Sequence, residues 1–387
     1  MRPISLELET LMLCCSPFCE VEQNRIFTSM SSPQFSAEIF LTKAKYLRLA
    51  PLAVAGIKRI KDTQTEQEWQ EKWTQARYIF STLEKTRSAF FIHNCKLKAE
   101  TEEMVAQMDR ENIWAIPLKG PHFAERIFGN IEVRVVGDID ILIELADVDR
   151  AISILKDNGY QTQIPAKMIH ERVQSHHVKL HHPLKKILLE LHWDLVQPDR
   201  FPRFSQKFWG DAHLWRGDRN DLSLPGLWLY ILIHHHEHVY GEYKTLLDCA
   251  WVCQTFDEQI NLTSLAQNYD LQGCWGVTQK QLLTYLGDYP VWPRPESRLN
   301  FYQTCMLKKL EEIPYDVKPV LYWRKLYARL LLPHLTEILR SALRAIFPRK
   351  EAISFLGSGA RIKHVYYFFS RLFVKNEQDS TIDVPRF

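Results

Sequence analysis

Residues 114–143, WAIPLKGPHFAERIFGNIEVRVVGDIDILI, constrain the fold more than any other part of the chain. Their pattern predicts an apolar strand over 113–118, a glycine turn, a short helix, and a second strand with two aspartates one residue apart. Because side chains alternate across a strand, Asp138 and Asp140 should share one face while Ile139 points into a core. This run therefore predicts a sheet with an acidic face.

Two neighbouring carboxylates repel each other, so the pair needs a compensating positive charge. Oxygen ligands suit a hard cation such as Mg²⁺, which also recruits the phosphates of a substrate. A carboxylate pair that bridges two such ions is the centre of many phosphoryl-transfer sites. We therefore predict that Asp138 and Asp140 are metal ligands; the alternative is an exposed strand edge.

The glycine turn next to the acidic strand predicts a phosphate-binding segment. Gly120 permits a tight turn and a close approach of the backbone, and Pro121 suits the first turn of a helix. A helix that starts there offers free amide groups to an anion. Lys119, and Arg134 at the start of the acidic strand, could each contact a triphosphate oxygen. For both, the alternative is a solvated charge at a strand end.

A predicted hairpin supplies a third acid. Residues 176–182 and 187–196 read as strands separated by Pro-Leu-Lys-Lys. Glu190 and His192 share one face of the second strand. We expect Glu190 to be the third metal ligand and an acceptor for the proton of an attacking hydroxyl; its alternatives are a solvated hairpin position or a partner for Lys185 or Lys186. His192 could orient Glu190, contact substrate, or be structural.

These residues together resemble the uncharacterised nucleotidyltransferase family of the polymerase-beta-like superfamily. The resemblance rests on LKG…R…GDIDILI…NGY over 118–160 and on ELHWDL over 190–195. It is strongest over 113–195 and weaker over the flanks. The wider superfamily has Gly-Gly or Gly-Ser in the turn. This chain instead has Gly120 followed by Pro121, and a long gap to Asp138.

The resemblance implies an activity and a set of roles. It implies transfer of a nucleoside monophosphate from an NTP to a hydroxyl, with release of pyrophosphate and with two Mg²⁺ ions (Mn²⁺ being the alternative metal). The implied catalytic metal ligands are Asp138, Asp140 and Glu190. The nucleotide contacts would be Lys119, Gly120, Arg134 and His192. The acceptor could be a small molecule, a sugar, RNA or a protein.

Two other functions stay open at the sequence level. The first is an inactive nucleotide- or RNA-binding regulatory module, similar to an antitoxin. The second is a histidine-metal hydrolase, because His234 and His238 lie one helical turn apart in HHHEH. The sequence is not H-E-x-x-H, however, and no His-Asp dipeptide supports a phosphohydrolase. The family resemblance instead implies that helical histidine, Lys244 and Asp248 line the nucleotide cleft.

The whole chain predicts an α+β protein. A small mixed-sheet core over 111–200 is flanked by a helical region over 1–110 and another over 201–387. In the first region, Trp69, Trp73, Phe80, Leu83 and Phe90 have the spacing of one face of a single long helix. The second region contains a basic, aromatic segment, 321–375. It could contact RNA or an anionic membrane surface, or be a solvated helix face.

Composition points to the cytoplasm. The net charge is only +3, so bulk charge does not indicate a nucleic-acid partner. Eight cysteines without a C-x-x-C pair are typical of a reducing compartment. The N-terminus lacks the pattern of a signal peptide, and the longest uncharged apolar stretch, 222–233, is too short for a membrane span.

Overall fold

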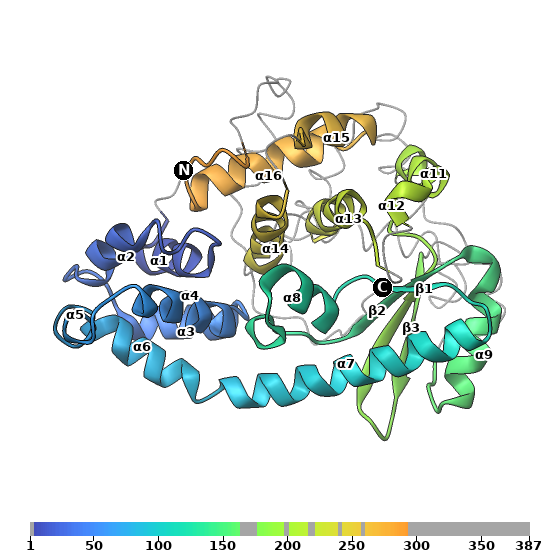
Figure 1. The fold of residues 1–387 in the computed structure, drawn as a ribbon, viewed down its shortest axis with the longest axis horizontal. Coiled ribbons are helices and arrows are strands. Elements are labelled where there is room, and N and C mark those ends of the chain that lie inside the picture. The colour runs from blue at the N-terminus through green and yellow to red at the C-terminus, as the bar shows by residue number, and fades with distance from the viewer. Residues whose placement is uncertain are drawn as a thin grey trace, which may run out of the picture. The chain divides into compact units, whose positions relative to one another are not determined.

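A computed structural model describes residues 4–162, 176–196, 201–215, 221–238, 242–256 and 260–292. All these ranges belong to one compact unit of the chain, Met1–Asn300. Helices surround a small mixed sheet, so the architecture is the expected α+β (Figure 1). The predicted basic segment 321–375 lies outside the described residues. No helix within the described ranges is long and apolar enough to cross a membrane.

Seven helices form the N-terminal part, and short polar caps begin several of them. Ser5, Ser36 and Thr65 each accept a backbone N–H of the following first turn. The helices are α1 (Leu6–Cys15), α2 (Gln23–Met30), α3 (Ala37–Tyr46), α4 (Ala50–Asp62), α5 (Glu66–Lys72), α6 (Thr74–Glu84) and α7 (Arg87–Arg110). Helix α1 is buried and crosses α4 so closely that a Cβ on Gly56 would lie 1.7 Å from the carbonyl oxygen of Cys14.

The prediction of one long helix from Trp69 to Phe90 is wrong. Three helices occupy this stretch, and the chain leaves helical geometry at Trp73, where φ is −96° and ψ is 40°. The apolar period continues through the break because Trp69 and Trp73 both pack inward, with their rings 6.1 Å apart. The spacing of apolar side chains predicts which face is buried, but it does not predict where the helical backbone is interrupted.

The core follows α7, and its described residues contain four strands, two α-helices and two 3-10 helices. Its elements are β1 (Ala115–Pro117), α8 (Pro121–Phe128), η1 (Ile131–Val133), β2 (Ile139–Ile143), η2 (Leu145–Asp147), α9 (Val148–Asp157), β3 (His177–His182) and β4 (Ile187–His192). The strand order is β1-β2-β4-β3, in which β2 and β4 are parallel and the other pairs antiparallel. The expected hairpin is therefore β3–β4. After α9, Gln161 forms an isolated antiparallel bridge with His181 of β3.

One face of the sheet is the hydrophobic core. Ile139, Ile141 and Leu189 point toward it, together with Met104 and Met108 of α7. Four short strands have little stability alone, so this packing against helices holds the sheet. Each large apolar side chain buried there contributes about 1.5–3 kcal/mol. In Figure 1, helices α1–α6 gather at one end of the long α7 and the sheet lies at the other.

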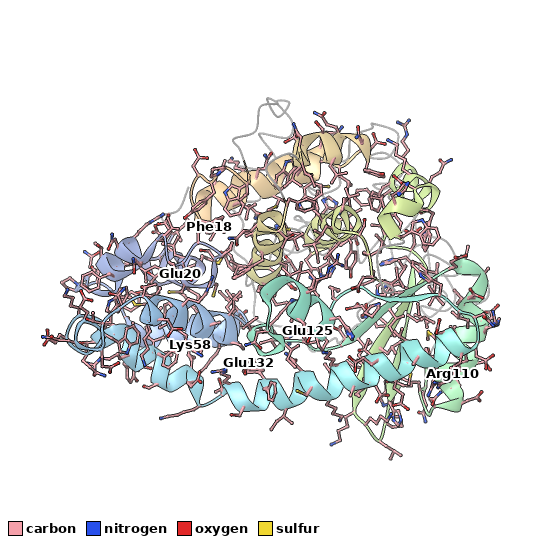
Figure 2. All side chains as sticks on the ribbon, viewed as in Figure 1. Phe18, Glu20, Lys58, Arg110, Glu125 and Glu132 are labelled. Carbon is pink, nitrogen blue, oxygen red and sulfur yellow. The ribbon has the colours of Figure 1, made fainter. Side chains whose placement is uncertain are left out.

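The C-terminal helices pack on the rest of the unit through α14, which contacts α1 and α8. They are α11 (Pro202–Gly210), α12 (Ala212–Trp215), α13 (Leu224–Glu237), α14 (Tyr243–Gln254), α15 (Leu262–Asn268) and α16 (Gln272–Tyr285). The segment after α16 returns to the N-terminal part, where the ring of Tyr289 stacks on that of Phe18 at 3.9 Å. Figure 2 labels Phe18. Among the described residues every cysteine is a free thiol.

Candidate active site

The sheet face opposite the core is polar and acidic. In the register of the strands, Asp140 of β2 lies beside Glu190 of β4, and Glu190 lies beside Lys179 of β3. His192 and His177 form the next row on the same face. Alternation along each strand explains this division, because residues 139, 141, 189 and 191 take the other face.

Asp140 is buried, with 2% of its surface exposed, and two cationic or polar groups hold its carboxylate. The Nζ atom of Lys119 lies 3.3 Å from Oδ2, and Nε2 of His192 lies 3.2 Å from Oδ1. Burial alone would raise the pKa of Asp140, but Lys119 and His192 outweigh it and lower the pKa to about 2. The carboxylate is therefore ionised at neutral pH.

Glu190 is half-buried and is surrounded by donors. Its carboxylate lies 2.6 Å from Nζ of Lys179, 3.5 Å from Nε2 of His192 and 3.8 Å from Nε2 of His177. Burial opposes ionisation, yet His192, His177 and Lys179 hold the pKa of Glu190 well below its usual range. Such a carboxylate is a ready ligand for a cation and a weak proton acceptor.

Asp138 lies just before β2 and is half-buried. Within the described ranges, no side chain forms a hydrogen bond or ion pair with its carboxylate. Burial and the neighbouring charge of Asp140 raise the pKa of Asp138. Of the three predicted acids, it is thus the one whose negative charge is least compensated.

The glycine turn has the conformation that the sequence predicted. Gly120 precedes α8 with φ of 82° and ψ of −150°, a region that is almost restricted to glycine. Pro121 is in the first turn of α8. The amide of Leu118 donates to the carbonyl oxygen of Asp140 at 2.9 Å, so the turn is tied to the acidic strand.

Arg134 is neither solvated nor directed at the three acids. Its guanidinium is buried and donates to both carboxylate oxygens of Asp248 on α14, with Nε–Oδ1 of 3.0 Å and Nη2–Oδ2 of 2.9 Å. Lys244 of the same helix donates to the carbonyl oxygen of Val135 at 3.2 Å. Helix α14 therefore fixes the loop that leads into the acidic strand. A phosphate contact by Arg134 stays a prediction.

The histidine-rich helix α13 approaches Lys119, beside the acids, through His234 and Tyr230. Nε2 of His234 lies 3.4 Å from Nζ of Lys119, and its ring packs on that of His238. His235 instead faces Thr245 and Gln281 inside the helical layer. Three-residue groups that could hold a metal ion occur elsewhere in the described part of the chain, and neither includes His234 nor His238.

Sequence reasoning missed several residues near the acids. Lys179 contacts Glu190, and an exposed-strand lysine gives no signal of its own in a single sequence. Tyr230 of α13 was read as part of an apolar helix, yet Lys119 Nζ lies 5.8 Å from its ring centroid. Its buried hydroxyl has no hydrogen-bond partner among the described residues. His176 and His177 were assigned only to a strand, although they adjoin His192.

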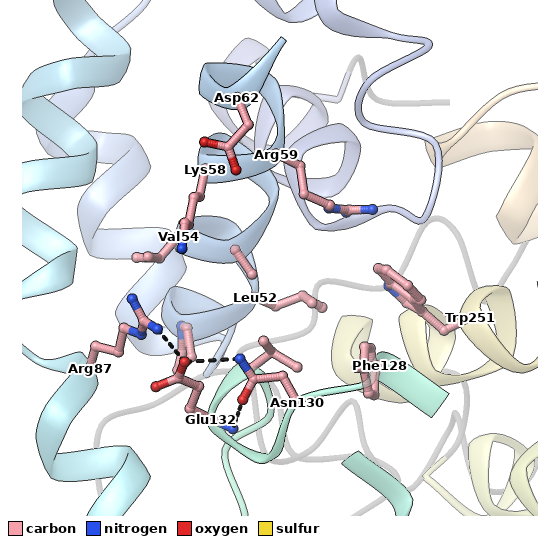
Figure 3. A pocket seen from close by; sticks show the side chains of 13 residues that line it. Leu52, Val54, Lys58, Arg59, Asp62, Arg87, Phe128, Asn130, Glu132 and Trp251 are labelled. Carbon is pink, nitrogen blue, oxygen red and sulfur yellow. Dashed lines mark hydrogen bonds and ion pairs between the residues drawn. The ribbon is translucent and has the colours of Figure 1, made fainter. Parts of the chain in front are cut away.

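A separate cavity of about 270 Å³ lies between α4, α14 and the segment that ends α8 (Figure 3). Charged side chains form one wall, where Glu132 accepts from Arg87 and from Asn130. On the other side the guanidinium of Arg59 lies 4.9 Å from the ring centroid of Trp251. None of the three acids lines this cavity.

A comparison with models of protein families establishes the family of the chain. The model of the uncharacterised nucleotidyltransferase family matches residues 33–274, which include every predicted site residue. The chain belongs to this family. The acids of the sheet face lie inside the segment that matches the family. Neither a search of curated proteins nor one of solved structures found a match.

Proposed function

We propose that this nucleotidyltransferase moves a nucleoside monophosphate from an NTP to a hydroxyl acceptor and releases pyrophosphate, with divalent cations held by Asp138, Asp140 and Glu190. One observation carries the proposal: Asp140 and Glu190 are register partners on adjacent parallel strands, and Asp138 comes two residues before Asp140. Two carboxylates from adjacent strands thus share one polar face, and a third carboxylate lies just before the first of these strands.

The donor set fits a hard divalent cation such as Mg²⁺, with Mn²⁺ as the alternative. Asp140, Glu190 and His192 each offer an atom, and these atoms lie within 4.8 Å of one another. Asp138 adds a carboxylate whose pKa is raised by burial and then by the neighbouring charge of Asp140, as expected where buried acids lie close together without enough positive charge. Once bound, ions would neutralise this charge and polarise the reacting phosphoryl group. The number of ions, two, rests on the family resemblance.

The chain's own residues have distinct tasks in this proposal. Gly120 and the first amides of α8 would bind phosphate oxygens, because a helix N-terminus attracts anions. Lys119 supplies a positive charge beside Asp140, and His192 holds the Asp140 and Glu190 carboxylates in place. We assign Glu190 the role of a ligand rather than a base, because its lowered pKa makes it a poor proton acceptor.

The test is incubation of the protein with each labelled NTP and Mg²⁺, with label transfer and pyrophosphate as readouts. The Asp138→Asn/Asp140→Asn variant should lose at least about 100-fold in rate, the scale of removing a main electrostatic contributor. Asp157→Asn, which changes an exposed acid at the end of α9, is the matched control and should behave as wild type. Equal rates in the double variant and wild type would overturn the proposal.

A binding module without turnover is the second candidate. The observation that favours it is that Lys119, His192 and Lys179 already pair with two of the three acids. A protein of this kind would bind a nucleotide or RNA with unchanged affinity in the double variant, and wild type would transfer no label. The same assay, with equilibrium nucleotide binding added, separates the two functions.

A further inference from the structure

Three histidines form a group next to the acids, and the proposed function uses only one of them, His192. His176 and His177 stand at the start of β3, and His192 faces His177 across the β3–β4 pair. The ring centroids are 4.5 Å apart for His176 and His177, 4.9 Å for His177 and His192, and 5.5 Å for His176 and His192. Each ring offers one nitrogen, and the three nitrogens lie within 4.8 Å of one another.

The distance between two of these nitrogens matches what a single metal ion requires. Two nitrogens bound to tetrahedral Zn²⁺ at about 2.0–2.1 Å lie about 3.3–3.4 Å apart. Nδ1 of His177 and Nε2 of His176 are separated by 3.3 Å. His176 and His177 are half-buried, which leaves a path for an ion, whereas His192 is 4% exposed and supplies the inner wall.

His192 provides an independent observation. Its Nε2 faces the carboxylates of Asp140 and Glu190. Its Nδ1 is buried and has no hydrogen-bond partner within the described part of the chain. A buried polar atom without a partner costs about 1–3 kcal/mol, so such an atom calls for an explanation. Ligation of an ion would satisfy it.

We propose that His176, His177 and His192 form a binding site for a borderline transition-metal ion of the Zn²⁺ or Co²⁺ type, beside the carboxylate site. Imidazole nitrogens suit these ions, whereas the carboxylates of the acidic site suit Mg²⁺. The three histidines leave a fourth position open to water or a solute, as in catalytic zinc sites. This site does not depend on the proposed nucleotidyl transfer.

His192 links the two sites. It belongs to both groups of potential ligands, and its ring also holds Asp140 and Glu190 in position. An ion on the histidines places positive charge next to Glu190, because Nε2 of His177 lies 3.8 Å from that carboxylate. Occupancy by Zn²⁺ should therefore weaken the binding of Mg²⁺ to the acids.

The experiment is a titration of the full chain with Co²⁺ in excess Mg²⁺, followed by visible absorption and by equilibrium dialysis. Tetrahedral Co²⁺ absorbs far more strongly than octahedral Co²⁺, so the spectrum reports the geometry at the site. Wild type should bind one Co²⁺ with tetrahedral bands, and Zn²⁺ should displace it. His176→Ala and His177→Ala should each weaken binding at least about tenfold, because even second-shell changes cost 10–100-fold.

Two variants make the outcome specific. His181→Ala removes an exposed histidine from the same face of β3 and should bind Co²⁺ as wild type does. Asp140→Asn, which should abolish nucleotidyl transfer, should keep the Co²⁺ spectrum, so failure of one proposal is distinguishable from failure of the other. Thermal melts of the metal-free variants check the fold, with His176→Gln and His177→Gln replacing any alanine variant that melts early.

The proposal is overturned if wild type shows no tetrahedral Co²⁺ bands, or if the His176 and His177 variants retain wild-type affinity. It is equally overturned if Asp140→Asn loses the ion while the histidine variants keep it, because the metal would then lie among the carboxylates. If His181→Ala weakened Co²⁺ binding as much as His177→Ala does, that result would also contradict the proposal.

Discussion

The guanidinium of Arg134 and the carboxylate of Asp248 form a buried, two-point ion pair between residues 114 positions apart. The side chains are only 5% and 2% exposed. Asn94 of α7 donates to the carbonyl oxygen of Arg134 at 2.9 Å from the other side. The loop before the acidic strand is thus fixed from both sides, which positions Asp138 and Asp140.

Asp248→Asn should destabilise the protein by about 3 kcal/mol, because a buried guanidinium would lose its compensating charge. The measurement is the free energy of unfolding in urea. The matched control is Asp270→Asn at the surface pair with Lys207, which should cost at most about 1 kcal/mol. The double change Arg134→Met/Asp248→Leu should cost less than Asp248→Asn. Equal effects of the two Asp→Asn variants would contradict the expectation.

Gly120→Ala should destabilise by about 1–3 kcal/mol through its backbone alone. A Cβ at this position would meet Asp138 O and Val136 Cγ1 at 3.8 Å, which is ordinary contact, so no clash contributes. The cost comes from the φ of 82° with ψ of −150°. Gly210→Ala at the end of α11 is the control and should be neutral or stabilising by up to about 1 kcal/mol. Urea melts of both variants give the comparison.

Local alternation in the sequence was enough to predict the hairpin and the shared face of Glu190 and His192. Pairing between distant segments was not readable, because nothing in the strand patterns indicates that β2 and β4 run parallel. The Asp140–Glu190 contact depends on that pairing.

The missed contacts have the same cause. In the sequence, Arg134 has the pattern of a charge at a strand end. Its partner Asp248 lies on α14, far along the chain, so the ion pair could not be predicted from local pattern. Lys179 belongs to the site only because the pairing of β3 with β4 brings it beside Glu190. The break at Trp73 also left no local signal, because α6 begins there without a side-chain cap. The capping box of Thr65 and Glu68 marks only the start of α5, before the break.

Asp138→Asn and Asp140→Asn should change stability in opposite directions when metals are chelated. The raised pKa of Asp138 means that folding disfavours its charged form, so removing the charge should stabilise by about 0.5–1 kcal/mol. Asp140→Asn loses charge-assisted contacts with Lys119 and His192 and should cost about 1–3 kcal/mol. Thermal melts in EDTA measure both.

Added Mg²⁺ should then make wild type more stable than Asp138→Asn. Wild type should gain stability with Mg²⁺ concentration, by about 2.7 kcal/mol at 100 times the dissociation constant. Neither variant should gain as much, whereas Asp157→Asn should follow wild type. A lower melting temperature for both variants in EDTA, or an unchanged response of Asp138→Asn to Mg²⁺, would show that the acids do not act as a cation site.

Lys244→Met should remove part of the pH dependence of stability. Burial, and next the charge of Arg134, lower the pKa of Lys244 to about 8. Between this value and the ordinary 10.5, the unfolded chain binds more protons than the folded one, so wild-type stability should rise with pH. Below pH 8 both states are protonated, and the buried charge is a constant cost.

The variant should therefore be more stable than wild type at pH 7, by on the order of 1–2 kcal/mol, and this advantage should shrink to nothing as the pH approaches 10.5. The loss of the hydrogen bond from Lys244 to Val135 O offsets part of the gain. Urea unfolding at pH 7, 8, 9 and 10 measures the difference, with Lys156→Met, an exposed lysine on α9, as the control. A constant difference between variant and wild type across that range would mean that Lys244 remains fully charged in the folded protein throughout, and that the junction between α14 and the acidic strand tolerates its charge without cost.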